Sequence, residues 1–153
     1  MFTDLLPAEH IAFGLDALDK DAVLEALVDL VAGAEAVRDA PALLDAVRAR
    51  EASLSTGVGD GLALPHAYSD AVTDAVAALA VIPAGVDFEA LDGAPVHIAV
   101  LLAGSPDGRA AHVRLLSRVS RVLGQAEVRR RLLAASSAVE ARGVLVDAES
   151  ALV

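Results

Sequence analysis

The sequence predicts an α/β protein of three layers, in which a mixed, largely parallel β-sheet is flanked by helices within a single domain over residues 1–153. Two near-continuous apolar runs, at 72–82 and 96–103, are typical of strands that are buried on both faces. Segments with helical periodicity stand before and after these runs, as expected of helices that pack on a sheet. A length of 153 residues is enough for one such core and too short for two.

Two helices are predicted before the first buried strand. Asp19 can cap a helix over residues 20–32, in which the apolar positions fall on one side. Asp39 and Pro41 begin a second helix that runs to Arg50, because proline is tolerated in the first helical turn. These two helices would cover one face of the sheet.

The segments around the first buried strand are less regular. Glycines at 57–61 end the second helix, and the short apolar piece at 62–64 follows them. Because Pro65 cannot donate a ladder hydrogen bond, we expect residues 62–64 to form an edge or terminal piece of strand at best. Residues 83–95, between the two buried strands, are interpreted as a loop.

Helices also follow the second buried strand. The pattern predicts a helix over 111–123 that Gly124 ends, then a helix over 126–135 and a shorter one that begins at Ser137. The inward-facing stripe of the first of these helices begins with a histidine and consists of His112, Leu116, Val119 and Leu123.

The composition excludes several classes of function. A formal net charge of −10 argues against nucleic-acid binding, which calls for an excess of Lys and Arg. The absence of cysteine excludes disulfides, a thiolate nucleophile and cysteine-ligated metals, and the four histidines lack short metal-ligand spacing. No apolar run approaches the roughly 20 residues of a membrane-spanning helix, and the first residues lack a signal-peptide pattern. We therefore expect a cytoplasmic protein without membrane insertion, metal or cofactor.

The stretch STGVGDGLALPHAY, at 55–68, carries the candidate site. The neutral imidazole of His66 can attack phosphorus, and the phosphoramidate that forms can pass its phosphoryl group onward. Glycines such as Gly57 allow backbone N–H groups to turn toward an anion, while Ser55 and Thr56 add hydroxyl donors. The stretch therefore predicts a phosphoryl site.

The residues alone leave other roles open. His66 could be a turn histidine without chemistry, and His112 could be a satisfied histidine near a helix start. If His112 is functional, it would hydrogen-bond the phosphoryl group or tune His66. Arg50 could hold phosphate oxygens with its forked guanidinium, or could be a cation that stabilises a helix end. We interpret His97 as structural and His10 as a surface residue.

Three blocks of the sequence resemble a known family. The pair RE at 50–51, followed after a short spacer by STGVGDGLALPHA, resembles the signature of the mannitol/fructose-type (type 2) enzyme IIA domain of the bacterial phosphoenolpyruvate-dependent sugar phosphotransferase system. The later stretches GVDFEALDGAPVHIAVLLAGSP and HVRLLSRVSRVL are similar to further blocks of that family, in the same order. The resemblance covers nearly the whole chain. Leu64, Ala67 and Phe88 stand where Ile, Gly and Trp are commoner, and none of these departures removes chemistry.

The resemblance implies a phosphohistidine carrier. His66 would accept a phosphoryl group from the phosphocarrier HPr and pass it to a sugar-specific enzyme IIB, with His112 close by and Arg50 helping to hold the site. Two alternatives remain open. A nitrogen-type regulatory enzyme IIA would use its phosphorylation state to control binding to other proteins, and an interaction module would keep the fold without phosphotransfer.

Partners in a relay must dissociate in every cycle, so we expect a small, mostly apolar docking surface around His66. The candidates for this surface are Val58, Leu62, Ala67 and Tyr68. The arginines at 114, 118, 121 and 129–131 are interpreted as a solvated helical face.

Overall fold

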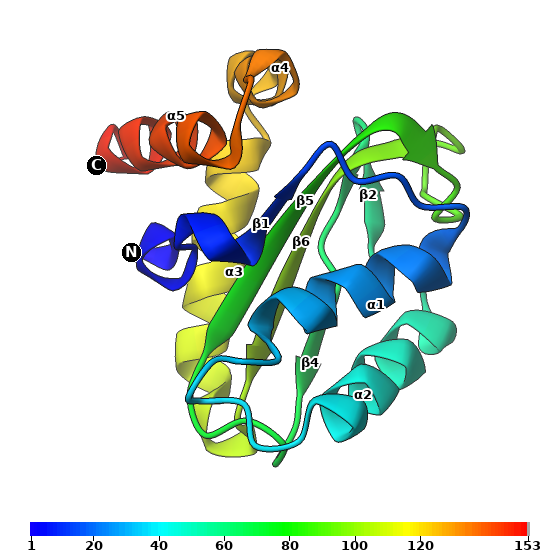
Figure 1. The fold of residues 1–153 in the computed structure, drawn as a ribbon, viewed down its shortest axis with the longest axis vertical. Helices are drawn as coiled ribbons and strands as arrows, with labels where there is room; N and C mark the ends of the chain where they lie inside the picture. Colours follow the sequence, from blue (N-terminus) through cyan, green and yellow to red (C-terminus); the bar gives the residue numbers. More distant parts are fainter. Residues whose placement is uncertain (153) are drawn as a thin grey trace.

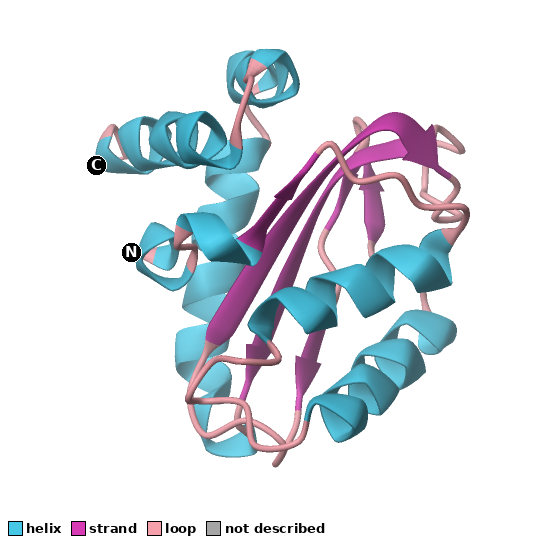
Figure 2. Ribbon diagram, viewed as in Figure 1, coloured by secondary structure: helices cyan, strands magenta, loops and turns pink. Residues whose placement is uncertain are grey.

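The computed structural model describes residues 1–152 and places a six-stranded sheet between two groups of helices (Figures 1 and 2). The strands are β1 (Ile11–Phe13), β2 (Gly57–Gly59), β3 (Leu62–Ala63), β4 (His66–Tyr68), β5 (Val76–Val86) and β6 (Val96–Gly104). The α-helices are α1 (Lys20–Val31), α2 (Ala40–Ser53), α3 (Arg109–Leu123), α4 (Ala126–Ala134) and α5 (Ala138–Ser150). Short 3-10 helices lie at Phe2–Leu5 (η1), Ala8–His10 (η2) and Pro106–Gly108 (η3).

The sheet is mixed. Its strand order is β1-β5-β6-β3-β2, and β4 pairs with β6 beyond the end of β3. Three of the five strand pairings are parallel, namely β1 with β5 and both β3 and β4 with β6, whereas β5–β6 and β2–β3 are antiparallel. Helices cover both faces of this sheet, which confirms the predicted fold class.

The two central strands separate two apolar cores. Successive residues of a strand point to opposite faces, so Ala78 and Ala80 of β5 pack toward α1 and α2, while Leu79 and Val81 pack toward α3, α4 and α5. Figure 1 shows α1 and α2 together on one side of the sheet and α3 on the other. The burial of β5 and β6 on both faces explains their near-continuous apolar runs.

The strand predicted over 72–82 is shifted along the chain. It begins at Val76, and Val72 instead forms an isolated bridge with Val37 in the connection between α1 and α2. It continues to Val86 through the exposed Pro83, at a place where its register against β6 shifts between Val81 and Val86. A register shift accommodates a residue that lacks an N–H donor. The interpretation of residues 83–86 as loop was therefore wrong.

The expectation that 62–64 forms an edge or terminal piece of strand is confirmed only in part, because β3 has two residues and ends before Pro65 but does not lie at an edge. β3 lies between β6 and β2, and β4 resumes the pairing with β6 immediately after Pro65. Pro65 cannot donate, but its carbonyl accepts a hydrogen bond from the N–H of Leu102 at 3.0 Å. The proline thus keeps β6 paired while it separates β3 from β4.

The predicted helix starts are confirmed by their caps. The side chains of Asp19, Asp39 and Ser137 each accept a backbone N–H three residues later, at 2.9, 3.0 and 3.1 Å. The last helix has 13 residues and is not the short one predicted. His10 is partly exposed, and its Nδ1 lies 3.1 Å from the carbonyl oxygen of Ala77. Within residues 1–152, no helix has the length and apolarity needed to cross a membrane.

Glu149, near the end of α5, joins this helix to two other parts of the chain. Its fully buried carboxylate accepts hydrogen bonds from the N–H groups of Phe2 and Thr3, at 2.9 and 3.0 Å, and from the Thr3 hydroxyl at 2.7 Å. The Arg118 guanidinium on α3 donates to the same carboxylate at 2.8 Å. These contacts join the beginning of the chain and α3 to the end of α5. Burial alone would raise the pKa of Glu149, but the Arg118, Thr3 and Phe2 donors together lower it.

Glu149→Gln should lower the free energy of unfolding at pH 7 by about 1–3 kcal/mol, because an amide cannot accept all four hydrogen bonds. A lowered folded-state pKa stabilises the fold above the ordinary value of 4.5, and this contribution is lost as the pH falls through the folded value. Chemical denaturation between pH 7 and pH 3 should therefore show a steeper loss of stability in the wild type than in the variant. Equal slopes would contradict this role for Glu149.

Candidate functional site

His66 is the first residue of β4 and lies opposite Leu102 of β6. Its half-buried ring makes a hydrogen bond from Nδ1 to the carbonyl oxygen of Leu64, at 2.8 Å. Because a carbonyl oxygen can only accept, this contact assigns the proton of the neutral ring to Nδ1. Nε2 then carries the lone pair and is the nitrogen that can act as a nucleophile.

A pocket of about 210 Å³ opens beside His66. Its lining residues are Arg50, Ser55, Thr56, Val58, Leu64, His66, Leu116 and Ser120. The structure therefore brings His66 together with three of the four residues predicted to stabilise a phosphoryl group. Arg50 uses one donor, Nη1, on the carbonyl oxygen of Leu54 at 2.8 Å. A guanidinium has five N–H donors, so most of the fork remains for an anion.

Gly57, the fourth predicted residue, does not line this pocket. Its N–H donates to the Ser55 hydroxyl oxygen at 3.0 Å, and that hydroxyl donates in turn to the carbonyl oxygen of Phe88. A Cβ atom at position 57 would lie 2.8 Å from the Cβ of Ala90, which is closer than real Cβ contacts. Glycine at 57 is therefore required by the close approach of the 88–91 segment.

The hydroxyl of Thr56 is also occupied. It donates to Glu51 Oε2 at 2.6 Å, and the Thr56 N–H donates to both carboxylate oxygens of the same residue. No role was predicted for Glu51 from the sequence. A local pattern could not reveal one, because the contact forms only when the loop folds back on the end of α2.

His112 lies in the first turn of α3, and its ring centroid is 6.0 Å from that of His66. The side chain is 2 % exposed, and neither ring nitrogen has a hydrogen-bond partner among residues 1–152. Burial, followed by the neighbouring His66, lowers the pKa of His112 to about 4, so the ring is neutral at pH 7. A Cβ atom on Gly104 would lie 3.1 Å from His112 Nδ1, so glycine leaves room for this ring.

Tyr68 completes the surroundings of His112. The two rings lie 4.6 Å apart, and the Arg109 guanidinium lies 4.4 Å from the centroid of the Tyr68 ring. Tyr68 was predicted only as a docking residue. Its position two residues after His66 in an extended segment was the signal that both side chains would share a face.

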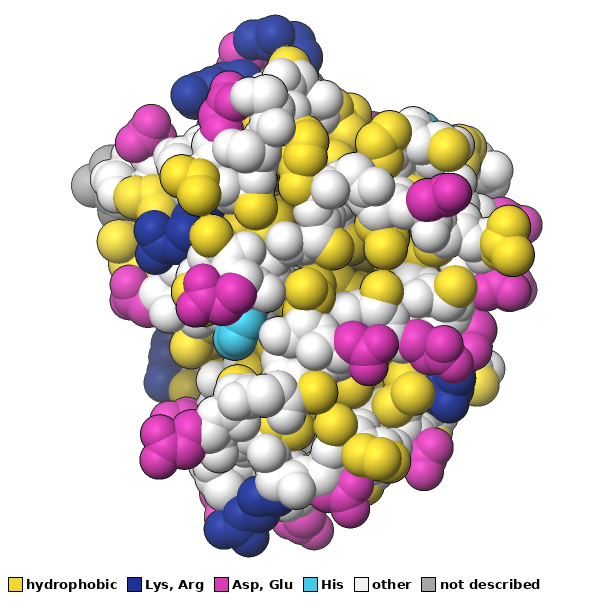
Figure 3. Space-filling view, viewed as in Figure 1, with side chains coloured by type: hydrophobic (Ala, Val, Ile, Leu, Met, Phe, Trp, Pro, Cys, Tyr) yellow, Lys and Arg dark blue, Asp and Glu magenta, His cyan; other side chains and the backbone are white. Residues whose placement is uncertain are grey.

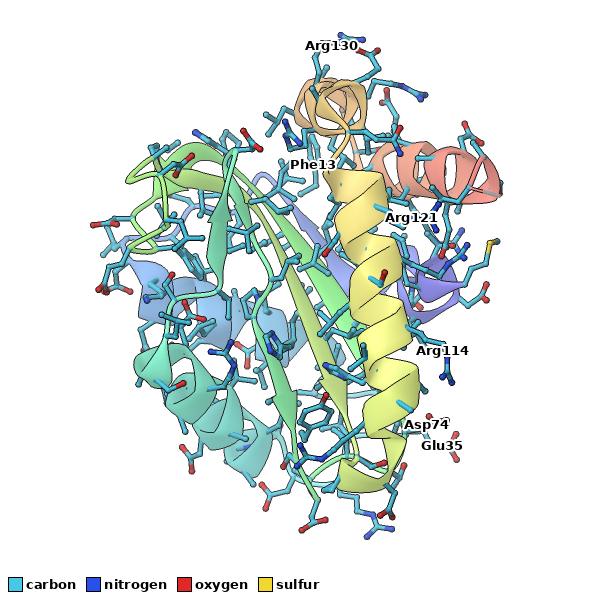
Figure 4. All side chains as sticks on the ribbon, turned by 180° about the vertical axis from the view of Figure 1, so that it is seen from behind. Phe13, Glu35, Asp74, Arg114, Arg121 and Arg130 are labelled. Atoms are coloured by element: carbon cyan, nitrogen blue, oxygen red, sulfur yellow. The ribbon has the colours of Figure 1, made fainter. Side chains whose placement is uncertain are left out.

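The residues predicted for a docking surface differ in their exposure. Val58 is 49 % exposed, whereas Leu62 and Ala67 are buried and cannot contact a partner. Their burial follows from pairing with β6, which the sequence analysis did not expect. Arg114 and Arg121, in contrast, point from α3 away from the sheet, as Figure 4 shows.

A larger hollow, of about 600 Å³, lies beside α1 and α2. Glu51 lines it together with acidic side chains that include Asp19, Asp21 and Glu89. Figure 3 shows acidic side chains gathered on the right of this face. Among residues 1–152, no group of three or more His, Cys, Asp or Glu residues could hold a metal ion.

Residues 4–147 match the model of the phosphoenolpyruvate-dependent sugar phosphotransferase system EIIA 2 family. The chain is 36 % identical to the fructose-specific EIIA component of Haloferax volcanii, over 94 % of this chain and 93 % of that protein. It is 35 % identical to a nitrogen regulatory protein of Pseudomonas aeruginosa, over 86 % and 85 % of the two chains. It is also 34 % identical, over 88 % of its length, to the fructose-specific EIIABC component of Bacillus subtilis, of which it spans only 21 %.

Solved structures agree with the sequence comparison. The fold is similar to that of the nitrogen regulatory protein IIA-Ntr from Neisseria meningitidis, with a TM-score of 0.87 and 29 % identity over 94 % of this chain and 97 % of that one. It is also similar to IIA mannitol in a complex with phosphorylated IIB mannitol from Escherichia coli, with a TM-score of 0.80 and 21 % identity over 93 % and 97 %. With the family model matched over most of its length, the chain belongs to the EIIA 2 family of the phosphotransferase system.

Proposed function

We propose that this protein is a phosphohistidine carrier that accepts a phosphoryl group on Nε2 of His66 from an HPr-type phosphocarrier and passes it to an enzyme IIB. The observation that carries the proposal is the hydrogen bond from His66 Nδ1 to the Leu64 carbonyl, which leaves the Nε2 lone pair free beside a pocket that Arg50 lines. The Nε2 lone pair forms a bond to phosphorus, while the bond from phosphorus to the donor breaks and its electron pair stays with the donor.

The charge of the phosphoryl group can be compensated locally. It adds between one and two negative charges to a chain of net charge −10. Arg50 supplies free guanidinium donors at the pocket, and no carboxylate is among the residues that line it. A neutral His112 has one ring N–H without a partner, and a nearby anion would favour its protonated form. The unpartnered nitrogens of His112 support its role as a hydrogen-bond donor to the phosphoryl group.

The acceptor is proposed from a solved complex. IIA mannitol from Escherichia coli, which shares this fold, has been solved with phosphorylated IIB mannitol. The exposed side chains of Leu54 and Val58 would supply the apolar contacts of such a docking surface. A cytoplasmic location is part of the same proposal, on the basis of family membership.

A regulatory role is the second candidate, because the nitrogen regulatory protein of Pseudomonas aeruginosa is 35 % identical to the chain and that of Neisseria meningitidis shares its fold with a TM-score of 0.87. The phosphoryl chemistry at His66 would be the same, and only the acceptor would differ. Labelled protein incubated with the IIB proteins of its own organism separates the two roles. Transfer of label to a IIB supports the transport role, and retention of the label favours the regulatory one.

His66→Ala should abolish labelling by radioactive phosphoenolpyruvate in the presence of enzyme I and HPr, because it removes the nucleophile. The label on the wild type should be acid-labile and base-stable, as expected of a phosphoramidate. His97→Gln is a matched control, since His97 is also half-buried with its Nδ1 bonded to a backbone carbonyl, and it should label normally. A wild type that takes up no label would favour the interaction module, and normal labelling of His66→Ala would exclude His66 as the acceptor.

His112→Ala should slow labelling by a factor on the order of 10 to 100, because one or two charge-assisted hydrogen bonds to the phosphoryl group are lost. Rapid-quench measurement of the labelling rate, at saturating HPr, checks this expectation. A rate equal to that of the wild type would mean that the buried ring serves packing alone.

A further inference from the structure

We propose that Glu51 is a positioning residue for His66, which acts through Thr56 and Leu64 and holds the ring in the tautomer that leaves Nε2 free. The inference rests on the proposed role of His66 as the phosphoryl acceptor. Glu51 does not line the pocket beside His66, and it is 5 % exposed. Its effect on the site must therefore pass through its neighbours.

The first step is the contact between Glu51 and Thr56. The Thr56 N–H lies 3.0 Å from Oε1 and 3.2 Å from Oε2, and the Thr56 hydroxyl donates to Oε2 at 2.6 Å. Both carboxylate oxygens therefore accept, so the backbone and the side chain of Thr56 are fixed by one group. Thr56 is 4 % exposed, and its donors would lie buried without partners if the carboxylate were removed.

The second step carries this constraint to the imidazole. The carbonyl oxygen of Thr56 accepts the N–H of Leu64 at 3.0 Å, and the carbonyl oxygen of Leu64 accepts Nδ1–H of His66 at 2.8 Å. Every link is a hydrogen bond between residues that are buried or half-buried. A displaced Thr56 would shift the Leu64 carbonyl and weaken the contact that sets the tautomer.

Glu51 is itself held in place by Lys20. Lys20, at the start of α1, donates to Glu51 Oε1 at 3.3 Å and to the carbonyl oxygen of Phe88 at 3.4 Å. The same Phe88 carbonyl accepts the Ser55 hydroxyl. Ser55 is therefore bonded to the 88–91 segment and Thr56 to α2, and Lys20 of α1 contacts both acceptors. Of these groups, Glu51 is the one that contacts Thr56.

Glu149 provides a matched control within the same chain. It is also a buried carboxylate on the last turns of a helix, and it also accepts hydrogen bonds from a backbone N–H and a threonine hydroxyl. It lies on the opposite face of the sheet from α2, and its hydrogen-bond donors are Phe2, Thr3 and Arg118, not Thr56 or Leu64. Substitution of either glutamate should therefore lower stability. Only substitution of Glu51 should change the tautomer of His66.

The test compares Glu51→Met, Glu51→Gln and Glu149→Met with the wild type. Nitrogen-15 NMR of the imidazoles, on the unphosphorylated proteins, reports the tautomer of neutral His66, and labelling from enzyme I, HPr and phosphoenolpyruvate reports the transfer rate. The wild type should show the Nδ1–H form. Glu51→Met should gain the Nε2–H form, which free histidine favours in water, and should label on the order of 100-fold more slowly, as expected when a reacting atom is displaced.

Glu51→Gln keeps one acceptor oxygen and should give intermediate values in both measurements, while Glu149→Met should keep the wild-type tautomer and rate. A folded Glu51→Met with an unchanged tautomer would overturn the proposal whatever its labelling rate, and so would an equal change in Glu149→Met. If Glu51→Met does not fold, Glu51→Gln is judged by the same two measurements. A wild type that fails to label would overturn the proposed function, but the NMR comparison would still decide the role of Glu51.

Discussion

The hydrogen bond between His66 Nδ1 and the Leu64 carbonyl is the interaction on which the proposed chemistry of the site depends. It requires the backbone to leave the strand ladder between these two residues and to rejoin it at once. Pro65 provides this, because its missing N–H breaks the ladder while its carbonyl still accepts the Leu102 N–H. The imidazole is therefore fixed to β6, the central strand that β3 and β4 both pair with, and not to a free loop. In the proposed function, a ring nitrogen held in this way needs little reorganisation when a partner docks.

The sequence was sufficient to predict the elements whose burial produces a continuous apolar pattern. β5 and β6 are buried on both faces and read as apolar runs, and Asp19 and Asp39 cap helices with side chains that the pattern shows directly. β3 was misjudged because the rule for proline concerns its missing donor, whereas the structure uses its carbonyl as an acceptor.

Less of the site than of the fold could be predicted from the chemistry of the residues alone. His66 stood out by its chemistry, but its proximity to His112 was implied by the family resemblance and not by spacing, since the two belong to different elements. Glu51 was missed for a physical reason. Beside Arg50 it reads as an ordinary charge at a helix end, and only the folded loop brings Thr56 onto its oxygens.

The buried Glu51 helps to explain how such short strands keep their places. β2, β3 and β4 have two or three residues each, which is too few for pairing alone to hold them. Glu51, near the end of α2, binds the N–H and hydroxyl of Thr56 just before β2, and Glu149, near the end of α5, binds the same groups of Thr3. In both cases a helix supplies a rigid acceptor for a segment that has few ladder bonds of its own. The geometry around His66 is therefore a joint property of β6 and α2, so the glycine-rich loop can be open to a partner without being free to move the imidazole.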